Sequence, residues 1–140
     1  MWIYFVTKTF ITTIEVTADH LDDLNHVNNV QYLLWAQEIA KAHWQEINDL
    51  AHGDGVWMVR NHEVEYRLGG FLGDTIRIET HVKSVRGPLS QRIVEFYNDK
   101  NDQLLVSCKT QWCYVDPSTR KPMKVADKIE KLFLSEEPPF

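Results

Sequence analysis

The residues best suited to chemistry lie in one short polar segment, Asp22 to Asn29, which reads DDLNHVNN. The segment holds two carboxylates, Asp22 and Asp23, and the imidazole of His26. Aspartate is ionised at neutral pH and can activate water as a base or attack a carbonyl carbon itself. The segment runs directly into a helical pattern, and the N–H groups at a helix start favour a developing oxyanion. Its residue types therefore suit an attack on a carbonyl carbon.

A long helix must hold this segment in place. Residues 29–47 contain no glycine or proline, and their apolar residues recur at helical spacing. One apolar stripe consists of Tyr32, Trp35, Ala36, Ile39, Ala40, His43 and Ile47. A second stripe consists of Val30, Leu33, Leu34 and Trp44. Because only a narrow strip is polar, we expect a helix enclosed on most sides, with Asn28 or Asn29 as its N-cap.

The rest of the chain predicts a sheet that wraps this helix. β-Branched residues at Thr9–Thr17 predict a first strand. Longer strands are predicted at Val56–Leu68, Asp74–Arg86, Ser90–Asn98 and Gln103–Val115, and a short closing helix at Ala126–Leu134. Short turns make consecutive strands antiparallel. These elements predict an α+β fold of the hotdog type, a curved antiparallel sheet of about five strands around one long helix, in a single domain over residues 1–140.

The stretch DDLNHVNNVQYLLW, Asp22 to Trp35, resembles the signature of the 4-hydroxybenzoyl-CoA thioesterase-like family of acyl-CoA thioesterases. In that family an Asp, three residues, HVNN and a tyrosine open the central helix. Plant acyl-ACP thioesterases carry a related segment. Residues 68–90 and 104–127 resemble the family's later strands, so the resemblance covers roughly the whole domain. One departure is Asn25, which stands where the family usually has glycine.

This resemblance implies a thioester hydrolase. It places the catalytic carboxylate on Asp22, as base or nucleophile, and the oxyanion donor on the backbone N–H of Asn29. His26 would orient the loop or contact the thioester, although loop histidines more often make structural hydrogen bonds. Asp23 is more simply a solvated loop residue. Some hotdog enzymes place a catalytic glutamate on the central helix, but the position of Glu38 on the polar strip favours a solvated or ion-paired residue.

Substrate contacts are expected at two places. Arg86, Ser90 and Arg92, near a strand turn, are candidates for the phosphates of coenzyme A, with ordinary surface charge as the alternative. Tyr32 and Trp57 are candidates for an apolar slot that holds the acyl group, with plain core packing as the alternative.

Composition excludes several classes of partner. The formal charge of −5 disfavours nucleic acid or an anionic membrane as main partner. No apolar run reaches the length of a membrane span, and the N-terminus lacks the features of a secretory leader. Cys108 and Cys113, on one predicted strand, should point to opposite faces and not pair. We therefore expect a cytoplasmic protein.

Neither a metal nor a cofactor is expected. The six histidines lack convincing zinc-ligand spacing, and no glycine-rich phosphate loop or GxSxG elbow is present. An open sheet edge favours pairing with a second copy, so we expect a homodimer or homotetramer. The favoured interpretation is an acyl-CoA thioesterase. The alternatives are an acyl-ACP thioesterase and a non-catalytic hotdog module that binds acyl or aromatic ligands. No motif specifies the acyl group.

Overall fold

One antiparallel sheet of five strands curves around a long helix in the computed structural model, which describes residues 8–134. The elements in chain order are β1 (Phe10–Glu15), the short 3-10 helix η1 (Ala18–His20), α1 (Asn29–Ala51), β2 (Val56–Tyr66), β3 (Thr75–Arg86), β4 (Leu89–Asn98), β5 (Leu104–Val115) and α2 (Asp127–Leu134). Each predicted strand and helix is present, and the bounds differ by a few residues. The fold is the α+β hotdog fold that the sequence predicts.

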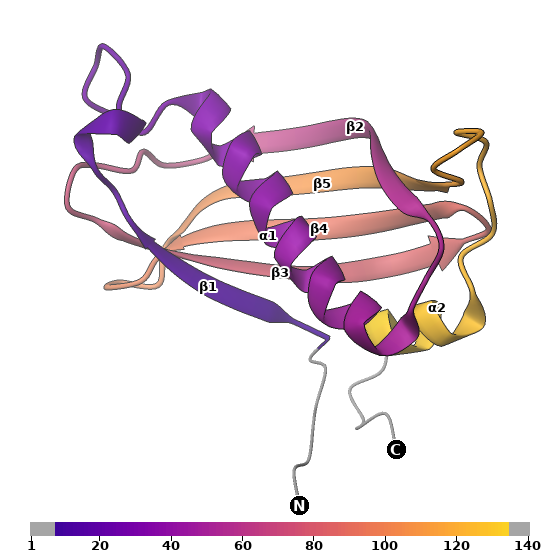
Figure 1. The fold of residues 1–140 in the computed structure, drawn as a ribbon. Helices are drawn as coiled ribbons and strands as arrows, with labels where there is room; N and C mark the ends of the chain where they lie inside the picture. Colours follow the sequence, from indigo (N-terminus) through magenta and orange to yellow (C-terminus); the bar gives the residue numbers. More distant parts are fainter. Residues whose placement is uncertain (1–7, 135–140) are drawn as a thin grey trace, which may run out of the picture.

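The strands lie in the order β1-β3-β4-β5-β2, with every neighbouring pair antiparallel. Figure 1 shows α1 crossing one face of this sheet, with α2 beside the C-terminal end of α1. The loop before α1 lies at the other end of that helix, so α2 and the Asp22 loop are far apart. Strands β1 and β2 form the two edges of the sheet.

The central helix is enclosed on one side only. Its buried residues are those of the first predicted stripe, Tyr32, Trp35, Ala36, Ile39, Ala40, His43 and Ile47. The second stripe is not covered as predicted, because Val30 is 60% exposed and Leu34 is 49% exposed. One sheet face can cover only one side of a helix, and these two residues lie off the side that α1 turns toward the sheet.

Strict alternation on β3 and β4 supplies the core under α1. On β3, Ile76, Ile78, Thr80 and Val82 are buried, and the residues between them are not. On β4, Ser90, Arg92, Val94 and Phe96 are buried in the same way. Burying one large apolar side chain of this kind contributes roughly 1.5–3 kcal/mol. The inward face of β4 thus carries one polar and one charged side chain among apolar ones.

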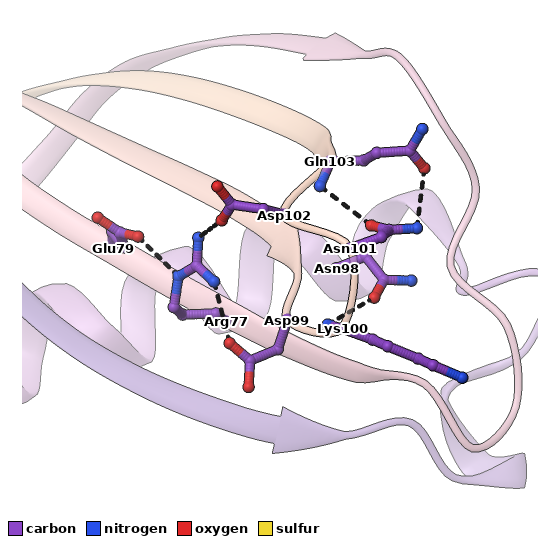
Figure 2. Close-up of polar contacts among 8 residues, drawn as sticks. All are labelled: Arg77, Glu79, Asn98, Asp99, Lys100, Asn101, Asp102 and Gln103. Carbon is purple, nitrogen blue, oxygen red and sulfur yellow. Dashed lines mark hydrogen bonds and ion pairs between the residues drawn. The ribbon is translucent and has the colours of Figure 1, made fainter.

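An ion network fixes the β4–β5 hairpin against β3 (Figure 2). Arg77 contacts Glu79 on its own strand at 2.7 Å, Asp99 in the hairpin at 3.0 Å, and Asp102. The hydrogen bond with Asp102, followed by those with Glu79 and Asp99, raises the pKa of Arg77. Arg77 lies on the face of the sheet that points away from α1. It is an arginine whose charge is paired with three carboxylates.

Both cysteines, Cys108 and Cys113, are buried free thiols. Between residues 8 and 134, no helix has the length and apolar character needed to cross a bilayer.

Candidate active site

The loop before α1 is folded around the side chain of Asp22. One carboxylate oxygen, Oδ1, accepts hydrogen bonds from the backbone N–H groups of Leu24 at 2.9 Å and His26 at 3.1 Å. The backbone N–H of Asp22 donates to the carbonyl of His26 at 2.7 Å. Such short-range bonds are the usual way in which aspartate shapes a turn. Within the described residues Oδ2 makes no hydrogen bond, so one carboxylate oxygen fixes the loop and the other is unused.

Asn25 has a left-handed backbone, with φ of 62°. A side chain on Cβ usually costs about 1–2 kcal/mol there, and asparagine is the residue besides glycine that tolerates this region best. The departure from the family's usual glycine therefore keeps the same backbone conformation available. The N–H of Asn25 donates to the carbonyl of Asp22 at 3.0 Å, which closes the turn.

The start of α1 has one unused backbone donor. Asn28 is the N-cap: its side-chain oxygen accepts from the N–H of Val30 at 3.0 Å, and its carbonyl accepts from the N–H of Gln31 at 2.9 Å. The N–H of Asn29 makes no hydrogen bond within residues 8–134, and Asn29 is exposed. Tyr66 on β2 donates its hydroxyl to the carbonyl of Asn29 at 3.0 Å. The first turn of the helix therefore offers the N–H of Asn29 to an incoming acceptor.

His26 lies on the same loop but packs outward. Its ring meets Phe71 edge-on with centroids 5.0 Å apart, and its backbone bridges to Phe71 as well. This contact joins the loop to the segment between β2 and β3, so the visible role of the ring is packing.

A cavity of about 450 Å³ lies between α1 and the sheet, on the side of β2. Its apolar lining consists of Leu34, Ala40, Trp44, Val56, Trp57, Trp112 and Phe133. Its near end, at Leu34, is about 7.5 Å along the helix from Asn29, at 1.5 Å per residue. Asp22, His26 and Asn29 do not line it. The loop and the cavity therefore occupy successive stretches of one helix.

The structure separates the predicted substrate-binding residues into two groups. Trp57, Ser90 and Arg92 line the cavity. Tyr32 does not: it is 3% exposed in the core beside Trp35 and Phe96, and burial raises its pKa to about 12. Arg86 is exposed at the end of β3, apart from the cavity.

Arg92 differs most from expectation. It is 4% exposed under the helices rather than at a surface turn, and a guanidinium in that place does not meet phosphates held in solvent. Its alternation with Val94 and Phe96 on β4 was the signal for an inward position, because alternate residues of a strand share a face. Trp112, which also lines the cavity, was missed for want of any motif.

Glu38 and Lys41 lie at the cavity with exposed side chains, and no ion pair joins them in the described structure. Residues 8–134 contain no group of three or more His, Cys, Asp or Glu side chains that could hold a metal ion.

The sequence profile of the family described as acyl-ACP thioesterase N-terminal domain matches residues 7–133. The chain belongs to this family. It is a thioester hydrolase with the hotdog fold, and the predicted resemblance to hotdog thioesterases is confirmed. The carrier of the acyl group is a separate question. The family is described by acyl-ACP thioesterases, whereas the Asp22–Trp35 signature resembles that of acyl-CoA thioesterases.

Solved structures of hotdog thioesterases superpose closely on this thioesterase. YbaW, a probable thioesterase from Escherichia coli, has a TM-score of 0.76 at 22% identity, over 91% of this chain and 98% of its own. A 1,4-dihydroxy-2-naphthoyl-CoA thioesterase from Synechocystis has a TM-score of 0.77 at 15% identity, over 89% and 95%. The 12:0-ACP thioesterase from Umbellularia californica has a TM-score of 0.77 at 16% identity, over 95% and 53%. At these identities the likeness shows the fold alone. A comparison with curated proteins gave no match.

Proposed function

We propose that this thioesterase hydrolyses acyl-CoA thioesters, with Asp22 as base or nucleophile and the backbone N–H of Asn29 as oxyanion donor. The observation that carries the proposal is the unused N–H of Asn29 at a helix start whose next two N–H groups are already bonded. An unused carboxylate oxygen of Asp22 sits on the loop that leads into that helix start. The group that stabilises the oxyanion, the Asn29 N–H, and the group that drives the attack, the Asp22 carboxylate, would thus lie on neighbouring parts of one segment.

The reaction would proceed as acyl transfer to water. The thioester carbonyl oxygen accepts from the N–H of Asn29, and the partial positive charge of the helix start favours the oxyanion that forms. One such donor is typically worth about 2.7–4 kcal/mol in the transition state. Asp22 takes a proton from the attacking water, or its carboxylate attacks the carbonyl carbon to give an anhydride that water then cleaves. Either route breaks the C–S bond and releases a carboxylic acid and the carrier thiol.

Acyl-ACP is the second candidate for the substrate, and the family match favours it. Among the structural relatives, one acts on a CoA thioester and another on an ACP thioester. The comparison of kcat/KM for one acyl group on the two carriers decides between them. A ratio well above one in favour of CoA supports the proposal, and the reverse ratio replaces it with acyl-ACP hydrolysis.

We also propose that the working form is a homodimer joined along β2. This strand is an edge of the sheet, and edges with free backbone groups tend to pair. Its exposed apolar residues Val56, Met58 and Val59 would be covered by such pairing. Sedimentation equilibrium tests the state: a dimer that Val59→Lys dissociates supports the arrangement, whereas a monomeric native protein excludes it.

The proposed activity is tested by thiol release from short, long and aromatic acyl-CoAs and from the same acyl groups on ACP. Hydrolysis of at least one of them supports the proposal, and hydrolysis of none contradicts it. A single turnover in ¹⁸O-labelled water then tests the nucleophilic route. Incorporation of ¹⁸O into Asp22 identifies an anhydride that water cleaves at the aspartyl carbonyl, whereas label in the product alone is the result of the general-base route or of cleavage at the acyl carbonyl.

A further inference from the structure

The cavity beside α1 has an apolar wall and a cationic floor. Arg92 lines it from β4 and is 4% exposed. Its Nη1 donates to Nδ1 of His43 and to Oγ1 of Thr80, both at 3.0 Å, and its guanidinium lies 5.6 Å from the ring centre of Phe133. Since arginine has only donors, His43 accepts through an unprotonated Nδ1. Both polar partners of Arg92 are therefore neutral groups.

Among residues 8–134, the positive charge of Arg92 is not balanced by an ion pair. Within residues 8–134 no carboxylate lies within ion-pair distance of it, in contrast to Arg77, which meets three. Burial lowers the pKa of Arg92 to about 9, so the guanidinium remains a cation at neutral pH. An unpaired buried charge is costly and is seldom kept for stability alone. The Nε and Nη2 donors of Arg92 also make no hydrogen bond to another described residue.

Two residues that line the same cavity, Trp57 and Trp112, each carry a further donor. The indole Nε1 atoms of Trp57 and Trp112 are buried and have no hydrogen-bond partner among the described residues. Trp112 pairs across the sheet with Ser90, two residues before Arg92 on the same inward face. Such diagonal neighbours lie about 7–8 Å apart, within reach of one small ligand group. An indole N–H can only donate. These three residues thus bring together donors, which call for an acceptor that carries negative charge.

We propose that this cavity binds the acyl group and selects acyl chains that end in a carboxylate, that is, monothioesters of dicarboxylic acids. This inference rests on the proposed function and adds its substrate class. The terminal carboxylate pairs with the guanidinium of Arg92 and accepts from an indole N–H, while the apolar wall holds a long methylene stem. The distance between Asn29, the proposed oxyanion donor, and the Arg92 end of the cavity leaves room for a long acyl chain. His43, which contacts Arg92, lies about 21 Å along α1 from Asn29, at 1.5 Å per residue.

Paired substrates test the selection. We would measure kcat/KM for ω-carboxyacyl-CoAs and for plain acyl-CoAs of equal chain length, over several lengths. At the best length we expect the ω-carboxyacyl-CoA to be favoured at least tenfold. Arg92→Met should reverse that preference, and Trp112→Phe, which removes one N–H and keeps an aromatic ring, should reduce it severalfold. Arg77→Met is the matched control, since it removes an arginine outside the cavity, and its preference should equal the native one.

A binding measurement keeps this test separate from the activity. Free dicarboxylic acids should raise the melting temperature of the native protein and of Arg77→Met, but not of Arg92→Met. Without ligand, Arg92→Met should melt close to the native protein, because the loss of a buried charge offsets the loss of its hydrogen bonds to His43 and Thr80. Hydrolysis with equal preference for both substrate types, in native and Arg92→Met proteins alike, overturns the inference and leaves the proposed function standing. Stabilisation by dicarboxylic acids that depends on Arg92, without hydrolysis of any thioester, supports the carboxylate site and contradicts the proposed function.

Discussion

The hydroxyl of Tyr66, on edge strand β2, donates a hydrogen bond of 3.0 Å to the backbone carbonyl of Asn29, the first residue of α1. Tyr66 thereby ties the start of the helix to the sheet edge that we propose as the dimer interface. A carbonyl held from one side keeps the peptide units of the first turn in place. The orientation of the Asn29 N–H depends on that turn.

Tyr66→Phe removes this bond and keeps the ring. We expect kcat to fall about tenfold or less, because the donor remains present but is less well oriented. Loss of a single hydrogen bond should lower the free energy of unfolding by about 0.5–1.5 kcal/mol. Thiol-release kinetics and urea unfolding measure the two effects. An unchanged kcat together with the expected loss of stability would show that the bond serves the fold only.

Substitutions at Asn25 test the left-handed turn beside Asp22. Asn25→Gly should keep activity, because glycine adopts this conformation without strain. Asn25→Ala should destabilise the turn by about 1 kcal/mol. It should also lower kcat, because the strained residue precedes His26, whose backbone N–H donates to the carboxylate of Asp22. Equal kinetics of the two variants would mean that the turn does not need φ near 62° for catalysis.

His62 makes stability depend on pH. It is half-buried on β2, its Nδ1 lies 2.7 Å from Oγ1 of Thr110, and burial lowers its pKa below 6.5. Between the lowered pKa and 6.5 the unfolded chain binds more protons than the folded one, so stability falls as pH is lowered through this range. His62→Gln should therefore flatten the fall in melting temperature below pH 6.5. A curve displaced in parallel, with its slope retained, would assign the pH dependence to other groups.

The sequence could predict the elements of this fold because their patterns are local. The helix stripe from Tyr32 to Ile47 and the alternation from Ile76 to Val82 each follow from one period, and the structure buries both. Exposure of Val30 and Leu34 could not be predicted in this way. Periodicity shows which residues share a side of a helix, whereas the number of covered sides depends on where the sheet ends.

The candidate site was predictable in part for a similar reason. Asp22 and Asn29 belong to one contiguous segment, so a local signature proposes them together as candidates. Arg92, in the floor of the cavity, is held by Thr80 and His43, so three separate elements meet behind it. No sequence pattern joins these positions, and the place of Arg92 near a turn predicted a contact with phosphates at the surface.

The most direct measurement of the central claim is kcat of Asp22→Asn beside its matched control, Asp23→Asn. The amide oxygen of an asparagine can still accept from the N–H groups of Leu24 and His26, so the loop and the melting temperature should be retained. We predict that Asp22→Asn lowers kcat by at least about 100-fold with unchanged affinity for a non-hydrolysable acyl-CoA analogue. The exposed Asp23 should tolerate the same change within about twofold of native, a change too small to reflect a role in proton transfer. Near-native turnover by Asp22→Asn would contradict the account.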